Sequence, residues 1–69
     1  MEKVTICGQE FTKVSPAEWE QKKGSLKMEY DKVMGDIHVK NWGFVILDQY
    51  GAPVDDEFLF EDFDKLANK

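Results

Sequence analysis

Residues 44–49 read FVILDQ and are the clearest strand signal in this chain of 69 residues. The first four side chains are all apolar, whereas a strand with one solvated face alternates apolar and polar residues. The run therefore predicts a strand that is buried on both faces, or one that uses its second face for a partner. In the latter case, residues 44–47 would form a homodimer interface in a structural or assembly protein.

Two short runs rich in Val, Ile, Thr and Phe precede this strand, namely Lys3–Cys7 and Glu10–Val14. The pair Gly8-Gln9 between them suits a two-residue type II′ turn, which has Gly at its first central position. This register places Ile6 opposite Phe11, with Val4 on the same face. We expect an antiparallel hairpin.

The tetrapeptide SPAE at residues 15–18 predicts the start of a helix. It provides a Ser cap, Pro at the first helical position and Glu three residues after the cap, which together make a capping box. The helix should continue to Lys22-Lys23 and end at Gly24 in a left-handed conformation. Trp19 is its large apolar residue and should point into the core.

The segment Ser25–Met34 fits two patterns. Alternation of Leu26, Met28 and Tyr30 indicates a strand, whereas a helical spacing of four, seven and eight relates Leu26, Tyr30, Val33 and Met34. We favour the strand slightly, which makes residues 34–36 a turn and residues 37–40 a further strand. Residues 41–43 should form a turn or bulge.

The C-terminal part begins with a predicted turn at Tyr50–Pro53. Two interpretations are open for residues 54–60. Either they form a strand that is followed by a helix from Glu61, or a helix already starts near Asp56. In both cases Phe63 and Leu66 share a helical face, and Lys65 and Lys69 lie near its C-terminal end. The predicted fold class is α+β: a single domain over residues 1–69, with an antiparallel sheet of four to five strands and one or two short helices.

Charge is distributed unevenly along the chain. The 14 acidic and nine basic residues give a net charge of -5, and the whole excess lies in residues 48–69, because residues 1–47 contain seven acids and seven lysines. Residues 55–64 read DDEFLFEDFD. We predict that the acids of this last third bind a partner: Asp48, Asp55, Asp56, Glu57, Glu61, Asp62 and Asp64.

Several classes of site are disfavoured by composition. All nine basic residues are lysines, and the lack of arginine, the usual ligand of phosphates and guanine edges, argues against direct DNA binding. Cys7 and His38 are the only thiol and imidazole, so no zinc site or nucleophile–base signature is present. We expect no enzyme activity, metal or cofactor. Without an apolar signal segment or membrane-spanning run, and with one cysteine, a cytoplasmic location is expected.

The acidic run can be compared with duplex DNA, which carries one charge per roughly 1.7 Å of its axis. In a helix, six carboxylates over ten residues span roughly 15 Å, or one per about 2.5 Å. In a strand they span roughly 33 Å and are divided between two faces. The neighbouring Phe58, Phe60 and Phe63 could add apolar contacts. The alternative is that these acids only face water and keep the protein soluble.

By its size, its arginine-free composition and its acidic-aromatic stretch 55–64, the chain resembles the small acidic proteins that phages make to take over host machinery. These include DNA mimics that block the nucleoid protein HU or inhibit RNA polymerase. The resemblance implies an inhibitor that acts in the host cytoplasm and binds a basic host protein, either a nucleoid protein or part of the transcription machinery.

A second hypothesis is a module that binds RNA or single-stranded nucleic acid directly. Trp42, Phe44 and Tyr30 would then stack on bases. Basic side chains beside them would contact the phosphates, namely Lys27, Lys32 and Lys40.

Overall fold

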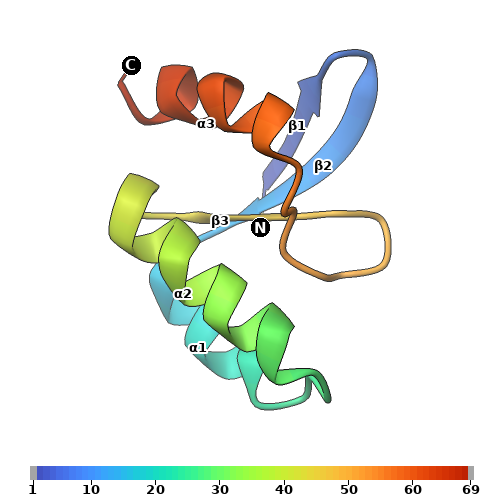
Figure 1. Cartoon of the computed structure of the whole chain (residues 1–69), viewed down its shortest axis with the longest axis vertical. Coiled ribbons are helices and arrows are strands. Elements are labelled where there is room, and N and C mark those ends of the chain that lie inside the picture. Colours follow the sequence, from blue (N-terminus) through green and yellow to red (C-terminus); the bar gives the residue numbers. More distant parts are fainter. Residues whose placement is uncertain (1, 69) are drawn as a thin grey trace.

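A three-stranded antiparallel sheet with the order β1-β2-β3 forms the centre of the computed structural model, which describes residues 2–68 (Figure 1). The elements are β1 (Glu2–Ile6), β2 (Gln9–Val14), α1 (Pro16–Lys23), α2 (Glu29–Trp42), β3 (Val45–Leu47), the 3-10 helix η1 (Glu57–Leu59) and α3 (Phe60–Ala67). The α+β class is confirmed. The expected four to five strands are wrong, because the described residues form three and the segments read as further strands are helical.

The hairpin of β1 and β2 is present, but its turn lies one residue earlier than predicted. Cys7 and Gly8 are its central residues, with φ of 52° and 77°, and positive φ at both positions defines a type I′ turn. Ile6 therefore pairs with Gln9, and Phe11 pairs with Val4. The predicted Ile6–Phe11 pairing is wrong by two residues, which leaves the buried face unchanged because strand side chains alternate with a period of two.

Helix α1 begins as the sequence predicts. The Ser15 hydroxyl accepts a hydrogen bond from the Glu18 N–H at 3.2 Å, and the Glu18 carboxylate accepts one from the Ser15 N–H at 3.3 Å, so the capping box is complete. The Trp19 side chain is buried in the core, as expected. The end of the helix differs, because Gly24 has a φ of -65° and is not left-handed. Ser25 instead donates through its N–H and its hydroxyl to the Lys22 carbonyl.

Helix α2 covers residues 29–34 and 37–40, and residues 25–28 before it form a turn and an irregular stretch, so both predicted strands are wrong. The predicted turn at residues 34–36 lies in the middle of this helix. Gly35 is there because α1 crosses at this point: a Cβ on Gly35 would lie 2.0 Å from Cζ2 of Trp19. The turn or bulge expected over residues 41–43 is found only at Gly43, which ends the helix with a φ of 78°, because Asn41 and Trp42 are still helical.

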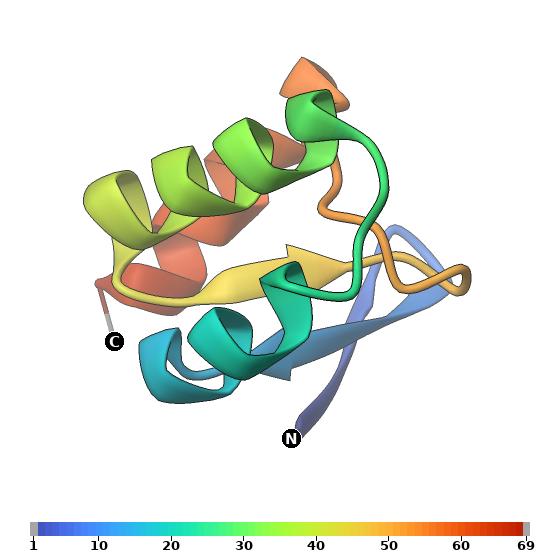
Figure 2. The ribbon, with the colours of Figure 1, turned by 90° about the horizontal axis from the view of Figure 1, so that it is seen from below.

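The strand β3 is buried on both faces, as its sequence predicts. Phe44 and Ile46 pack on one face with Phe63 of α3, and the other face packs against Trp19 of α1. The side chains on that second face are Val45 and Leu47. In the view of Figure 1, α3 lies on one side of β3 and α1 with α2 on the other, whereas Figure 2 shows from below that α2 and α3 lie together and that α1 is across β3 from them. Because residues 44–47 are at most 7% exposed, they are not available as a homodimer interface.

The C-terminal part follows the helical interpretation. The turn at Tyr50–Pro53 is confirmed, with Gly51 at a φ of 82°. The Asp56 carboxylate then caps η1, which runs directly into α3, so the strand considered over residues 54–60 is wrong. Phe63 is fully buried and Leu66 is half-buried against the same cluster. Lys65 lies in the last turn of α3, whereas Lys69 lies outside the described residues.

Candidate protein-binding surface

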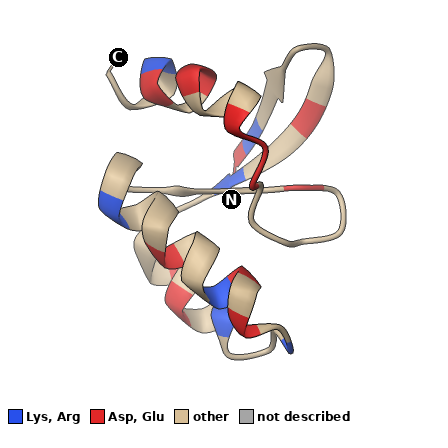
Figure 3. Ribbon diagram, viewed as in Figure 1, with Lys and Arg blue, Asp and Glu red and all other residues tan. Residues whose placement is uncertain are grey.

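Six of the seven acids predicted to bind a partner lie on one continuous stretch, which we call the acidic segment, residues 55–64. It comprises two residues before η1, η1 itself and the first part of α3, and its acids are shown in red in Figure 3. Residues 57–64 are helical, so the denser of the two charge spacings applies to them. No lysine forms a salt bridge with these carboxylates anywhere in residues 2–68. The segment therefore presents uncompensated negative charge.

Two hydrogen bonds attach the acidic segment to α2. The Tyr30 hydroxyl donates to Oδ2 of Asp55 at 2.8 Å, and the Trp42 indole N–H donates to Oδ1 of Asp64. The first bond holds the hydroxyl proton and raises the pKa of Tyr30 above its ordinary value. Trp42 also packs edge-on against the Phe60 ring. Both ends of the acidic segment are thus fixed beside α2.

The remaining carboxylates of the segment differ in the contacts that they make within the protein. Asp56 accepts a hydrogen bond from the Phe58 N–H at 3.0 Å, and Asp62 lies 3.9 Å from the Cys7 thiol of the hairpin turn. Glu57 and Glu61 are exposed, and their carboxylates make no hydrogen bond or ion pair within the described part of the chain. These two glutamates contribute least to the fold and are the most accessible to a partner.

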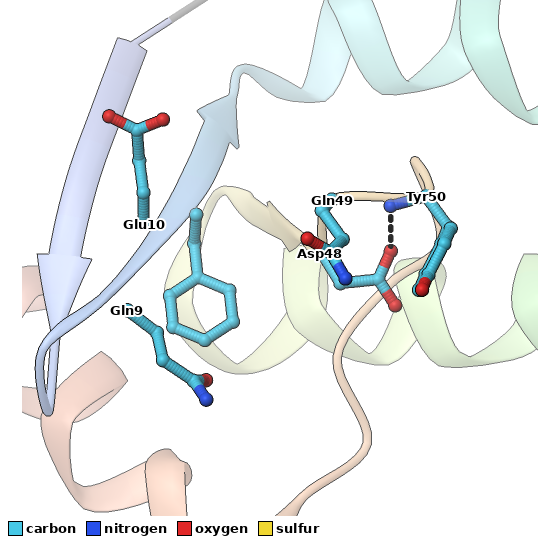
Figure 4. A pocket seen from close by; sticks show the side chains of 6 residues that line it. Gln9, Glu10, Asp48, Gln49 and Tyr50 are labelled. Carbon is cyan, nitrogen blue, oxygen red and sulfur yellow. Dashed lines mark hydrogen bonds between the residues drawn. The ribbon is translucent and has the colours of Figure 1, made fainter.

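Asp48 lies apart from the acidic segment, although the sequence grouped it with the other six. It directly follows β3, and its Oδ1 accepts hydrogen bonds from the N–H groups of Tyr50 and Ala52 at 2.8 and 3.0 Å. The carboxylate therefore shapes its own loop. It also lines a shallow concavity of about 360 Å³ between β2 and this loop (Figure 4), together with Gln9, Glu10, Phe11, Gln49 and Tyr50. This lining contains neither a cysteine nor a histidine.

His38 lies in the core and not in a reactive site. Its ring is fully buried, and its Nδ1 accepts a hydrogen bond from the Ile46 N–H at 3.2 Å. Nε2 must then carry the proton, which it donates to the Val54 carbonyl at 2.7 Å. Burial lowers the pKa of His38 below its ordinary value. Cys7 is exposed at the hairpin turn, so the structure does not bring these two residues together.

No group of three or more His, Cys, Asp or Glu side chains within residues 2–68 is arranged to hold a metal ion. None of the helices in this same part of the chain is long and apolar enough to cross a membrane.

Sequence reasoning missed an exposed apolar row on α2, which we call the α2 stripe: Tyr30, Val33 and Ile37. Their spacing of three and seven residues places them on one helical face. They are 55%, 55% and 38% exposed. The helical interpretation of residues 25–34 contained part of this signal, but the strand interpretation assigned alternate residues to opposite faces. The stripe becomes visible only when residues 29–42 are a helix.

The proposed stacking platform for nucleic acid is not formed. Phe44 is 7% exposed and Trp42 is half-buried, with its N–H bound to Asp64. Of the three aromatic residues only Tyr30 is exposed, and its hydroxyl is bound to Asp55. The second hypothesis therefore lacks the row of accessible rings that base stacking requires.

No known protein family, curated protein or solved structure matches the chain. The acidic segment and the α2 stripe are the features of the chain itself that point to a function.

Proposed function

We propose that this protein is a non-enzymatic inhibitor that binds a basic DNA-binding protein of its host through the acidic segment. The observation that carries the proposal is the set of six carboxylates on one segment with no ion pair to a lysine in residues 2–68. Such a field accelerates the encounter with a cationic partner and raises its specificity. A nucleoid protein or a component of the transcription machinery is the expected partner, as for other DNA mimics.

The spacing of the acids supports this proposal. Glu61 and Asp64 are three residues apart in α3, so they lie on one face of that helix, and Glu57 precedes them in the 3-10 helix η1. Along the axis of α3 the separation of Glu61 and Asp64 is about 4.5 Å. One strand of duplex DNA carries a phosphate every 3.4 Å, so the row has a comparable order of charge density. A surface that binds phosphates with lysine and arginine could bind this row as well.

The test compares two variants that each remove three carboxylates. The first, Asp56→Asn/Glu57→Gln/Glu61→Gln, neutralises three of the six carboxylates of the acidic segment and keeps the cap, because Asn caps helices as well as Asp. The second, Glu2→Gln/Glu10→Gln/Glu20→Gln, neutralises three exposed acids on β1, β2 and α1. Both variants have the same net charge, so a difference in their binding depends on the position of the removed carboxylates and not on the total charge.

Binding to purified HU and to bacterial RNA polymerase is measured at 50 and 300 mM salt, with and without a duplex DNA competitor. We expect the wild-type chain to bind one of these proteins, with binding that weakens steeply with salt and is displaced by DNA. The first variant should bind at least tenfold more weakly and the second within about twofold of wild type. Equal binding by both variants, or no effect of DNA, would refute the proposal.

A further inference from the structure

The solvent face of α2 is divided into a polar side and an apolar side. Towards α1, Asp36 accepts hydrogen bonds from the Trp19 indole N–H at 3.0 Å and from the Lys23 ammonium at 3.2 Å. The α2 stripe lies next to this polar side and meets the acidic segment at its first residue, Tyr30, which binds Asp55. The apolar row and the carboxylates are therefore in contact at the N-terminal end of α2. Figure 2 shows α2 and the orange segment that carries η1 together on the side away from α1.

The exposed apolar residues contribute little to folding. Phe58 in η1 is 91% exposed and Met28, just before α2, is 63% exposed. The free energy gained by burying an apolar side chain scales with the area removed from water, so these side chains gain almost none of it in the free protein. Single exposed apolar residues are ordinary, but a row beside a nearly free phenylalanine indicates a contact surface.

The two hydrogen bonds to α2 determine where the acidic segment lies along this helix. Tyr30 and Trp42 are twelve residues apart, so the acidic segment is attached to α2 at two points about 18 Å apart along its axis. The α2 stripe begins at the first of these points, and the acidic segment continues from there through Glu57 and Glu61 to the second. This length equals about three turns of helix, which is the size of an epitope made by an amphipathic helix.

We propose that the α2 stripe and Phe58 bind an amphipathic α-helix of the partner, whose apolar face lies on the stripe and whose lysine or arginine residues lie along one edge, beside the acidic segment. The basic character of this helix rests on the proposed function, whereas its apolar face is inferred from the stripe. The helix has positive charge where the protein has negative charge, and apolar side chains where Val33 and Ile37 are exposed. A second copy of this chain fits less well, because its own net charge of -5 opposes association.

Three synthetic 18-residue peptides provide the probe. The first is an amphipathic helix with leucines on one face and lysines along one edge. The second has the same composition in an order that forms no apolar face, and the third has glutamate in place of lysine. Fluorescence anisotropy measures their affinity for the wild-type chain. We expect the first peptide to bind at least tenfold more tightly than either of the others.

Two variants of the protein separate the apolar contribution from other effects. Val33→Gln/Ile37→Gln removes the apolar character of the stripe with side chains that favour helix. Tyr50→Ser is the control, because Tyr50 is 85% exposed on the loop after β3 and belongs to neither surface. The first variant should lose at least tenfold in affinity for the amphipathic basic peptide and the second less than twofold. Circular dichroism and thermal melting confirm that both remain folded.

Equal binding of the first two peptides, or unchanged binding by the Val33/Ile37 variant, overturns the inference, because charge alone would then explain recognition. Binding of the glutamate peptide as tightly as the lysine peptide also overturns it. Sedimentation could also show that the wild-type chain is a dimer and the Val33/Ile37 variant a monomer. A second copy of the chain would then be the occupant of the stripe, and this result also overturns the inference. Failure of the proposed function is seen separately, as an absence of DNA-competed binding to HU and RNA polymerase while the peptide results hold.

Discussion

At the scale of single residues, the unexpected element is the buried imidazole of His38. It connects the N–H of Ile46 with the carbonyl of Val54, beside the direct hydrogen bond from the Val54 N–H to the Ile46 carbonyl at 3.0 Å. Since buried backbone groups must find partners, the ring satisfies the two groups that this direct pairing leaves over. The sequence placed His38 in a predicted strand and gave no sign of this role, because the residues it joins are eight and sixteen positions away.

Protonation of His38 should destabilise the protein. A charged ring has hydrogens on both nitrogens, so Nδ1 could no longer accept from Ile46. Its pKa is lowered in the folded state, so near and below the unfolded value of about 6.5 the unfolded chain binds more protons, and stability falls as the pH falls through this range. The slope can reach about 1.4 kcal/mol per pH unit.

Urea unfolding at pH 7.5, 6.5 and 5.5 measures this dependence. The carboxylates with lowered pKa, Glu18 and Asp36, titrate below about 4.5 and do not contribute in that range. In His38→Gln the slope between pH 7.5 and 5.5 should disappear, together with a loss of about 2 kcal/mol or more at pH 7.5 from the unpaired groups. A wild-type stability that is constant over this range would contradict the assigned hydrogen bonds.

Gly35 and Gly24 provide a matched pair for testing helix contact. In Gly35→Ala the new Cβ meets the Trp19 ring at 2.0 Å, which forces α1 and α2 apart, so we expect a loss of about 2 kcal/mol despite the better helix propensity of alanine. Gly24→Ala meets nothing within 4 Å at a φ of -65° and should be neutral or stabilise by up to about 1 kcal/mol. Chemical denaturation of both variants is the measurement, and equal effects would show that the α1–α2 crossing is looser than described.

At the scale of elements, the sequence predicts correctly those features that depend only on neighbouring residues. The capping box, the turn at Tyr50–Pro53 and the doubly buried β3 all follow from adjacent residues. Helix α2 was missed because Gly35 resembles a turn residue when its contact with Trp19, sixteen positions earlier, is unknown. Tertiary contact overrides local propensity in such cases.

The same reason explains what was missed in the candidate surface. The acidic segment was predicted from composition, and its helical form was one of two alternatives. Its attachment to α2 could not be predicted, because Tyr30 and Asp55 are 25 residues apart. The α2 stripe required the correct period for residues 29–42, and Asp48 was grouped by charge although its backbone contacts assign it to a loop.

The β1–β2 hairpin should be stabilised by Cys7→Asn. Cys7 has a φ of 52°, in the left-handed region where Asn is enriched, and Asn-Gly is the preferred pair of the type I′ turn. We expect a gain of about 0.5 kcal/mol, whereas Cys7→Val should lose about 1 kcal/mol or more because a β-branched side chain clashes in this region. Thermal unfolding of both variants is the measurement. The opposite order of their melting temperatures would contradict the turn type.

At the scale of the whole molecule, the sheet separates two apolar clusters that share β3. Ile46 packs with Phe63 on one face, and Val45 packs with Trp19 on the other. The net charge of -5 is concentrated on the segment that packs on the first face. A partner that binds the acidic segment and the α2 stripe would thus contact α2, η1 and the first part of α3, which the hydrogen bonds of Tyr30 and Trp42 hold together.

This shared strand predicts a single cooperative unfolding transition. The two tryptophans report different clusters: Trp19 lies in the cluster with Val45, and Trp42 packs against the cluster that contains Phe63. Consecutive β3 residues belong to opposite clusters. Neither cluster can therefore unfold without displacing the strand. In the single-tryptophan variants Trp19→Phe and Trp42→Phe, fluorescence and circular dichroism should therefore give coincident urea midpoints within each variant, as two-state unfolding requires. If Trp42 fluorescence changed at lower urea than the circular dichroism signal in Trp19→Phe, α3 and the acidic segment would detach first, and the surface they form would be an independent, weaker unit.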